Sequence, residues 1–189
     1  MKKSAVRERI LDVASRLFYE QGYNLTGINQ IIEEAGIARG SLYNHFDSKT
    51  DLLLAYLKEA EDNWFGEMTH FLSPIIDPQE KILALFDFRM ARQLKLNFAG
   101  CQFIKISSEV PKDDAAVFKA VTHQKDRFRL FILDRLKERN MPNRLMPMEM
   151  LADTLYLLLE GAAVTGAIYK SSDALENARK IAGKLLSDT

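Results

Sequence analysis

A short run of polar and aromatic residues near residue 40 carries side chains suited to binding another molecule. If residues 39–46 are helical, Leu42 and Phe46 lie four residues apart on one face and can be buried. The opposite face then carries Arg39, Gly40, Ser41, Tyr43, Asn44 and His45. Such side chains hydrogen-bond base edges or phosphate oxygens in a major groove, and a glycine in the first turn permits close backbone approach. Each residue alone also fits a solvated surface, but together they favour DNA.

A predicted helix precedes this run and would position it. Its apolar residues recur at the spacing of one helical face: Ile28, Ile31, Ile32 and Ala35. Thr26 is the predicted N-cap residue, and Gly36 ends the helix about three residues before the next one begins. This is the spacing of a helix-turn-helix motif.

A further helix is predicted to follow, beginning with a capping box formed by Ser48 and Asp51. Lys49 lies in its first turn, and both a helix N-terminus and a lysine attract phosphate. We expect base contacts from Arg39, Ser41 and Asn44, close approach at Gly40, phosphate contacts from Thr26, Tyr43, His45 and Lys49, and either kind of contact from Asn29.

Residues 6–57, and especially GYNLTGINQIIEEAGIARGSLYNHFDSKTDLL, resemble the DNA-binding domain of the TetR family of bacterial transcriptional regulators. The shared features are a Gly-aromatic pair, a Thr-capped helix, an Ala-Gly-apolar turn and a Leu-Tyr-x-His-Phe segment followed by lysine. Ala38 departs from the pattern, because the family more often has Ser or Thr at this cap. The resemblance implies an all-α fold with an N-terminal three-helix helix-turn-helix DNA-binding domain and a C-terminal helical ligand-binding and dimerisation domain.

We predict that residues 1–48 form the DNA-binding domain and residues 49–189 the second domain, with about nine helices in all. Besides the two helices of the motif, periodicity predicts helices over residues 4–21, 48–71, 79–97, 101–110, 113–139, 148–169 and 172–186. Loops are predicted over residues 73–78 and 140–147, each of which contains two prolines.

The last two predicted helices have features of an interface. The first contains the small-residue tract GAAVTGA at residues 161–167, and the second ends in Ile181, Leu185 and Leu186. In the TetR family these two helices form a four-helix bundle across a two-fold axis, so the resemblance implies a homodimer. The alternative is that they close the core of a monomer.

The composition is that of an ordinary soluble chain of 189 residues, with 26 basic and 26 acidic side chains. This neutrality argues against nonspecific nucleic-acid coating and polybasic membrane binding. A single cysteine excludes an intrachain disulfide. We expect neither a signal peptide nor a membrane-spanning helix, and hence a cytoplasmic protein.

No catalytic signature is present, so we do not expect an enzyme, a cofactor or a metal site. His45, His70 and His123 are scattered, and the chain has no glycine-rich phosphate loop and no cysteine cluster. The resemblance implies instead a pocket for an unidentified small-molecule effector within residues 50–170. Its candidate lining residues are Trp64, Met68, Phe86, Met90, Phe103 and Tyr156, although each of them also fits plain core packing.

Cys101 is a candidate redox site. It follows Gly100 at the predicted start of a helix, and Lys105 lies one turn further on; a helix N-terminus and an ammonium group both stabilise a thiolate. The segment AGCQFIKISSEV is similar to that of a TetR subgroup in which this cysteine responds to electrophiles or oxidants. The alternative is an ordinary buried cysteine.

These observations predict a sequence-specific repressor that binds a palindromic operator as a homodimer and is released by a small-molecule ligand. A first alternative is a repressor switched by oxidation or alkylation of Cys101. A second, from another class, is a helical carrier of hydrophobic ligands or a protein-interaction module without DNA binding.

Overall fold

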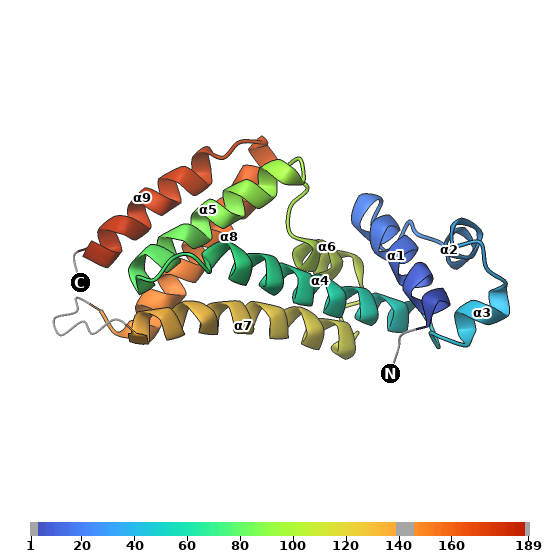
Figure 1. The fold of residues 1–189 in the computed structure, drawn as a ribbon. Coiled ribbons are helices and arrows are strands. Elements are labelled where there is room, and N and C mark those ends of the chain that lie inside the picture. Colours follow the sequence, from blue (N-terminus) through green and yellow to red (C-terminus); the bar gives the residue numbers. More distant parts are fainter. Residues whose placement is uncertain (1–3, 139–145, 188–189) are drawn as a thin grey trace. The chain divides into compact units, whose positions relative to one another are not determined.

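The computed structural model describes residues 4–138 and 146–187, which form nine α-helices and no strand (Figure 1). The helices are α1 (Ala5–Glu20), α2 (Ile28–Glu34), α3 (Arg39–Tyr43), α4 (Lys49–Leu72), α5 (Pro78–Lys95), α6 (Gln102–Glu109), α7 (Ala115–Glu138), α8 (Met148–Tyr169) and α9 (Asp173–Ser187). The predicted all-α fold is confirmed.

The chain divides into two compact units. Unit 1 comprises residues 1–63 and 102–123, and unit 2 comprises residues 64–101 and 124–189. Both α4 and α7 therefore contribute one part to each unit, and α6 belongs to unit 1. The compact units divide the chain at other positions than residue 48. The boundary predicted there, between a DNA-binding and a ligand-binding domain, remains a prediction.

Unit 1 is built on the helix-turn-helix. Helix α1 buries one apolar stripe, formed by Ile10, Leu11, Ala14, Leu17 and Phe18, and it contacts both α2 and α3. Helix α3 is shorter than predicted, since it ends at Tyr43 and residues 44–45 form a turn. Phe46 nevertheless stays buried with Leu42, so the predicted apolar anchors of α3 are confirmed.

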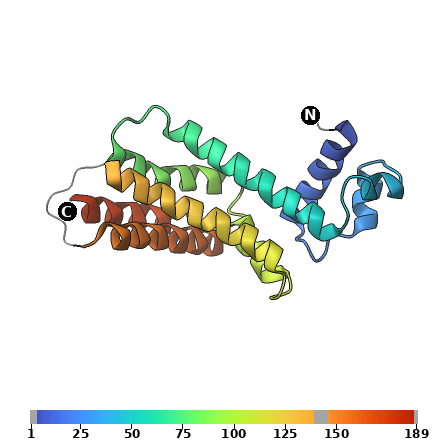
Figure 2. The same ribbon diagram turned by 90° about the horizontal axis from the view of Figure 1, so that it is seen from below.

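In unit 2, α5, α8 and α9 lie side by side (Figures 1 and 2). Helix α5 begins at an Asp77 N-cap whose carboxylate accepts a hydrogen bond from the Glu80 backbone N–H at 2.9 Å, followed by Pro78 in the first turn. It ends in a left-handed turn, where Asn97 and Phe98 have φ angles of 47° and 56°. The loop predicted over residues 140–147 falls mostly on residues 139–145, which lie outside the described residues.

Helix α8 corrects one expectation. By length and composition it is apolar enough to cross a membrane, although no such helix was predicted. The missed signal is a 22-residue helix in which few charged residues interrupt the apolar ones. Leu151, Leu155 and Leu159 on this helix are buried in the core that α8 shares with α5 and α9, which is the arrangement of a core helix.

Candidate nucleic-acid interface

Helix α3 and the turn that follows it separate their apolar and polar residues onto two faces. Leu42 and Phe46 are 0% and 1% exposed and hold the segment against unit 1. Arg39, Tyr43 and Asn44 are exposed, whereas Ser41 and His45 are half-buried. The guanidinium of Arg39 lies 5.9 Å from the centre of the Tyr43 ring, so the largest two side chains of the face lie together.

Gly40 has no role in packing within unit 1. A Cβ atom added at this position would have no heavy atom within 4 Å, and the residue is exposed. Because glycine lowers helix stability by about 1 kcal/mol relative to alanine, its presence here has no intramolecular explanation. The absence of a side chain leaves the backbone of α3 accessible to a partner from outside.

The predicted roles of Thr26 need correction. Gly27, not Thr26, is the N-cap residue of α2, and no side chain caps that helix. The Thr26 side chain is 0% exposed, and its hydroxyl donates a hydrogen bond to the Gly22 carbonyl at 2.7 Å. The prediction of an N-cap is therefore wrong, and a hydroxyl buried in this way is not available to a phosphate group.

One of the two hydrogen bonds of the capping box predicted at the start of α4 is present, and the other has a different donor. The Ser48 hydroxyl accepts a hydrogen bond from the Asp51 N–H at 3.0 Å, as a capping box requires. The Asp51 carboxylate, however, accepts from the N–H of Asp47 at 3.2 Å. The N-terminus of α4 thus begins one residue after Ser48, with Lys49 as its first helical residue.

Lys49 is fixed to the loop between α1 and α2. Its Nζ donates a hydrogen bond to the Tyr23 carbonyl at 2.6 Å and lies 4.1 Å from the centre of the Tyr23 ring. Partial burial lowers the pKa of Lys49, and the nearby Glu109 carboxylate opposes this shift. The residue as a whole is half-buried.

Glu109, at the end of α6, also holds this loop and was not found from the sequence. Its carboxylate accepts a hydrogen bond from the Asn24 N–H at 3.0 Å, and its own carbonyl accepts one from Asn24 Nδ2 at 2.8 Å. Gly22, with a φ of +93°, leaves room for this carboxylate, because a Cβ at residue 22 would lie 2.8 Å from Glu109 Oε1. Asn24 and Glu109 are 85 positions apart in the sequence, so no local pattern could reveal their contact.

The comparisons with known proteins identify this arrangement. Residues 10–56, which run from α1 into α4, match the model of the bacterial regulatory proteins of the tetR family. Over 83 residues the chain is 37% identical to the HTH-type transcriptional repressor KstR2 of Rhodococcus jostii, and the alignment covers 44% of this chain and 41% of that protein. The HTH-type transcriptional activator FasR of Mycolicibacterium smegmatis is 34% identical over 86 residues, or 43% of this chain and 39% of FasR.

The alignments therefore cover less than half of each of these curated relatives. A solved structure extends the likeness to nearly the whole chain. The TetR-family regulator SCO4454 of Streptomyces coelicolor superimposes with a TM-score of 0.85 and 26% identity, and covers 97% of this chain and 95% of its own. Residues 10–56 are therefore a DNA-binding region of the tetR type, and the fold of nearly the whole chain is that of a TetR-family regulator. The predicted family is confirmed.

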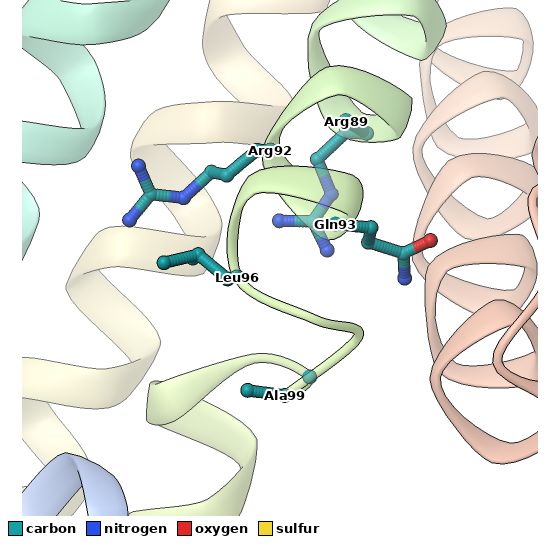
Figure 3. A pocket seen from close by; sticks show the side chains of 6 residues that line it. Arg89, Arg92, Gln93, Leu96 and Ala99 are labelled. Carbon is teal, nitrogen blue, oxygen red and sulfur yellow. The ribbon is translucent and has the colours of Figure 1, made fainter.

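The structure distributes the six residues predicted to line an effector pocket unevenly. Trp64, Met68 and Phe86 are buried in the core of unit 2, with Met90 and Tyr156 partly buried against it, whereas Phe103 belongs to the core of unit 1. None of them lines the cavity beside α5, whose wall includes Arg89 and Gln93 (Figure 3). Their role in ligand binding remains a prediction.

Cys101 has a cationic neighbour, but a different one from that predicted. The ammonium of Lys105 lies over the Tyr19 ring, 5.3 Å from its centre, so the proposed pairing with Cys101 is wrong. Lys125 Nζ instead lies 3.5 Å from the Cys101 sulfur and 2.5 Å from a Glu160 carboxylate oxygen. Burial, with a further contribution from Glu160, raises the pKa of the neighbouring Tyr156 to about 12.

Proposed function

We propose that this TetR-family protein is a sequence-specific DNA-binding regulator that represses transcription. One observation carries the proposal: α3 buries Leu42, and together with its C-cap residue it presents Arg39, Tyr43 and Asn44 to solvent. A short helix of this kind, preceded by α2, fits the major groove with its N-terminal residues toward the bases. Repression, as opposed to activation, is the more specific part of the proposal, because the similar protein KstR2 is named a repressor whereas FasR is named an activator.

The exposure of each residue supports a division of labour at the interface. Arg39, Ser41 and Asn44 would contact base edges, and Gly40 would allow the backbone to approach them. Tyr43, His45 and Lys49 would contact phosphates, and the exposed Asn29 of α2 could make either kind of contact. Thr26 has no direct contact in this proposal, because its hydroxyl is used inside the protein.

We infer a homodimer formed by α8 and α9. Leu157 and Ile168 on α8 are 65% and 71% exposed, and Ile181 on α9 is also exposed. Apolar side chains on adjacent helices favour burial against a second copy, which forms an isologous interface. Two copies of α3 about 34–36 Å apart would then read a palindromic operator.

The effector is a small molecule bound in unit 2, which lowers operator affinity by favouring another spacing of the two recognition helices. A coupling of about 1–3 kcal/mol is sufficient for such a switch. The protein would act in the bacterial cytoplasm, where its operator lies.

Selection of bound sequences from a random DNA pool tests the proposal directly. We expect enrichment of one palindrome, with affinity that falls steeply as the salt concentration rises. The two alternatives from another class predict otherwise: a hydrophobic-ligand carrier or a protein-interaction module would enrich no sequence. A gel-shift assay on the DNA upstream of the protein's own gene provides an independent check.

A second candidate is a switch at Cys101, and the proximity of Lys125 favours it. The ammonium of Lys125 lies 3.5 Å from the sulfur, and reactive cysteines are found beside cationic groups of this kind. In the test, the thiol adds across the double bond of N-ethylmaleimide, its proton passing to the adjacent carbon, and operator binding is measured before and after. Loss of binding in the native protein but not in Cys101→Ser would support this switch, and unchanged binding after full modification would exclude it.

A further inference from the structure

The loop between α1 and α2 is held by the last residue of α6, entirely within unit 1. The Glu109 carboxylate accepts a hydrogen bond from the Asn24 backbone N–H at 3.0 Å, and the Glu109 carbonyl accepts one from Asn24 Nδ2 at 2.8 Å. One bond restrains the backbone of Asn24 and the other restrains its side chain. Together they fix both the position and the orientation of the loop at this residue.

Gly22 makes room for this contact. Its φ of +93° is a backbone conformation that glycine adopts readily. A Cβ atom at residue 22 would lie 2.8 Å and 2.9 Å from the two carboxylate oxygens of Glu109, closer than a carbon and an oxygen pack. Another residue at this position would therefore displace the carboxylate from Asn24.

A single peptide group joins Glu109 to Lys49. The N–H of Asn24 and the carbonyl of Tyr23 belong to the same peptide group, which is planar and rigid. Glu109 accepts a hydrogen bond from the N–H of this group, and Lys49 Nζ donates one to its carbonyl at 2.6 Å. Because the plane turns as one body, loss of the bond to Glu109 would also let the carbonyl that holds Lys49 move.

Glu109 also acts on the charge of Lys49. Partial burial lowers the pKa of this ammonium, and the Glu109 carboxylate opposes the shift. An ammonium has three N–H donors, and the Tyr23 carbonyl uses one of them. A cation that the loop has already oriented loses less side-chain freedom when it binds a phosphate oxygen, so its contact contributes more to affinity.

We propose that Glu109 is a positioning residue of the DNA interface, which acts through the Tyr23–Asn24 peptide group to hold the Lys49 ammonium in the orientation that binds a phosphate. Glu109 itself does not touch DNA, since a carboxylate and a phosphate repel each other. The inference rests on the proposed function and deepens it, because it adds a residue of α6 to an interface built from α2, α3 and the start of α4.

Two substitutions of Glu109 separate its hydrogen bond from its charge. Glu109→Gln and Glu109→Ala both remove the negative charge, but glutamine keeps an oxygen that can accept from the Asn24 N–H. In fluorescence anisotropy with the selected operator, we expect Glu109→Ala to bind about fivefold more weakly than Glu109→Gln. Equal affinities of the two variants, or tighter binding by Glu109→Ala, would overturn the proposal.

Ser108→Ala is the matched control on the same helix. Ser108 is exposed, and its hydroxyl donates to the Lys105 carbonyl within α6. This variant should bind the operator within about twofold of the native protein. A fivefold loss in Ser108→Ala would mean that any change at the end of α6 weakens binding, which contradicts a specific role for Glu109.

The same pair of substitutions in a Lys49→Met background distinguishes positioning from a merely structural role. Methionine keeps an unbranched side chain at residue 49 but removes the ammonium. We expect the difference between Glu109→Ala and Glu109→Gln to fall below about twofold, because the group that Glu109 positions is gone. A difference that stays fivefold would show that Glu109 acts through the stability of unit 1.

Asn24→Ala provides a second variant if Glu109→Ala does not fold. Asn24 is exposed, and its substitution removes the bond to the Glu109 carbonyl while the backbone N–H remains. Operator binding should weaken by about two- to fivefold in the native background and by less than that in Lys49→Met. No loss, or the same loss in both backgrounds, would contradict the proposal.

The salt dependence of binding separates this inference from the proposed function. If Lys49 contacts a phosphate, Lys49→Met should reduce the slope of the logarithm of the binding constant against that of the salt concentration by about one. An unchanged slope, with normal operator binding by the native protein, would exclude Lys49 and the role of Glu109 but leave the regulator in place. If the native protein selects no operator, the proposed function itself is wrong.

Discussion

Helix α3 and the charged cluster of unit 2 use polar residues in opposite ways. On α3, Arg39, Tyr43 and Asn44 are exposed, and the fold depends on the apolar Leu42 beneath them. In unit 2, the side chains of Arg89, Lys125 and Glu160 are largely buried and depend on one another for their charge balance. The comparison teaches that the exposed polar residues of the first region are not needed for packing, whereas the buried charged residues of the second contribute to the stability of the fold.

Glu160→Ala should have the largest effect, because it leaves Arg89 and Lys125 without their shared carboxylate. We expect a loss of about 3–5 kcal/mol in the free energy of unfolding, as when one partner of a buried ion pair is removed. Urea unfolding monitored by circular dichroism measures it. Arg39→Ala on the exposed face is the matched control and should change stability by less than about 0.5 kcal/mol; similar losses for both would break the comparison.

Leu42→Ala tests the anchor of the recognition helix. Leu42 is 0% exposed, and its truncation should cost about 2–5 kcal/mol through lost burial and the cavity left behind. Thermal unfolding provides the measurement. Leu25, which is 78% exposed in the same unit, is the control, and Leu25→Ala should be nearly neutral. A neutral Leu42→Ala would mean that the helix is not held as described.

Arg39→Ala and Tyr43→Ala should separate base contacts from phosphate contacts. We expect Arg39→Ala to cost about 1–3 kcal/mol of operator binding and to relax the preference at one base pair. Tyr43→Ala should weaken binding to operator and random DNA alike. Fluorescence anisotropy with both DNAs measures the two ratios, and equal losses on both DNAs for both variants would count against these assignments.

Gly40→Ala should give the smallest change in stability. It tests whether the exposed face of α3 takes no part in packing within unit 1. Since an added Cβ would have no heavy atom within 4 Å, alanine should stabilise unit 1 by up to about 1 kcal/mol through its better helix propensity. The same methyl group should weaken operator binding. A variant that melts at a higher temperature and still binds DNA with unchanged affinity would remove Gly40 from the interface.

Much of the fold follows from local patterns. The apolar spacing of Ile10, Leu17 and Phe18 predicts α1, and the stretch around Leu42 predicts both the recognition helix and its exposed face. These features are local because a helix is defined by residues three and four apart. The cap of α2 was not predicted correctly. The Thr26 hydroxyl donates to a carbonyl within the α1–α2 loop, and α2 begins without a side-chain cap.

Tertiary contacts account for what the sequence did not provide. Lys105 is near Cys101 in sequence, yet Lys125 from α7 is the cation that reaches the sulfur. Arg89 and Gln93 lie on the same stripe of α5 as Ile82 and Phe86, and such polar residues within an apolar stripe are the signal that could have revealed the cavity. Their partners Glu160 and Ala163, however, lie on α8 and could not be read from α5 alone.

The separation of Leu42 and Phe46 from the exposed residues of α3 has an evolutionary consequence. In the proposed interface, substitutions at Arg39 or Asn44 would redirect the protein to another promoter without loss of the scaffold beneath them. New regulatory circuits can therefore arise by point changes on a few positions, and the same positions offer a route to retargeting by design.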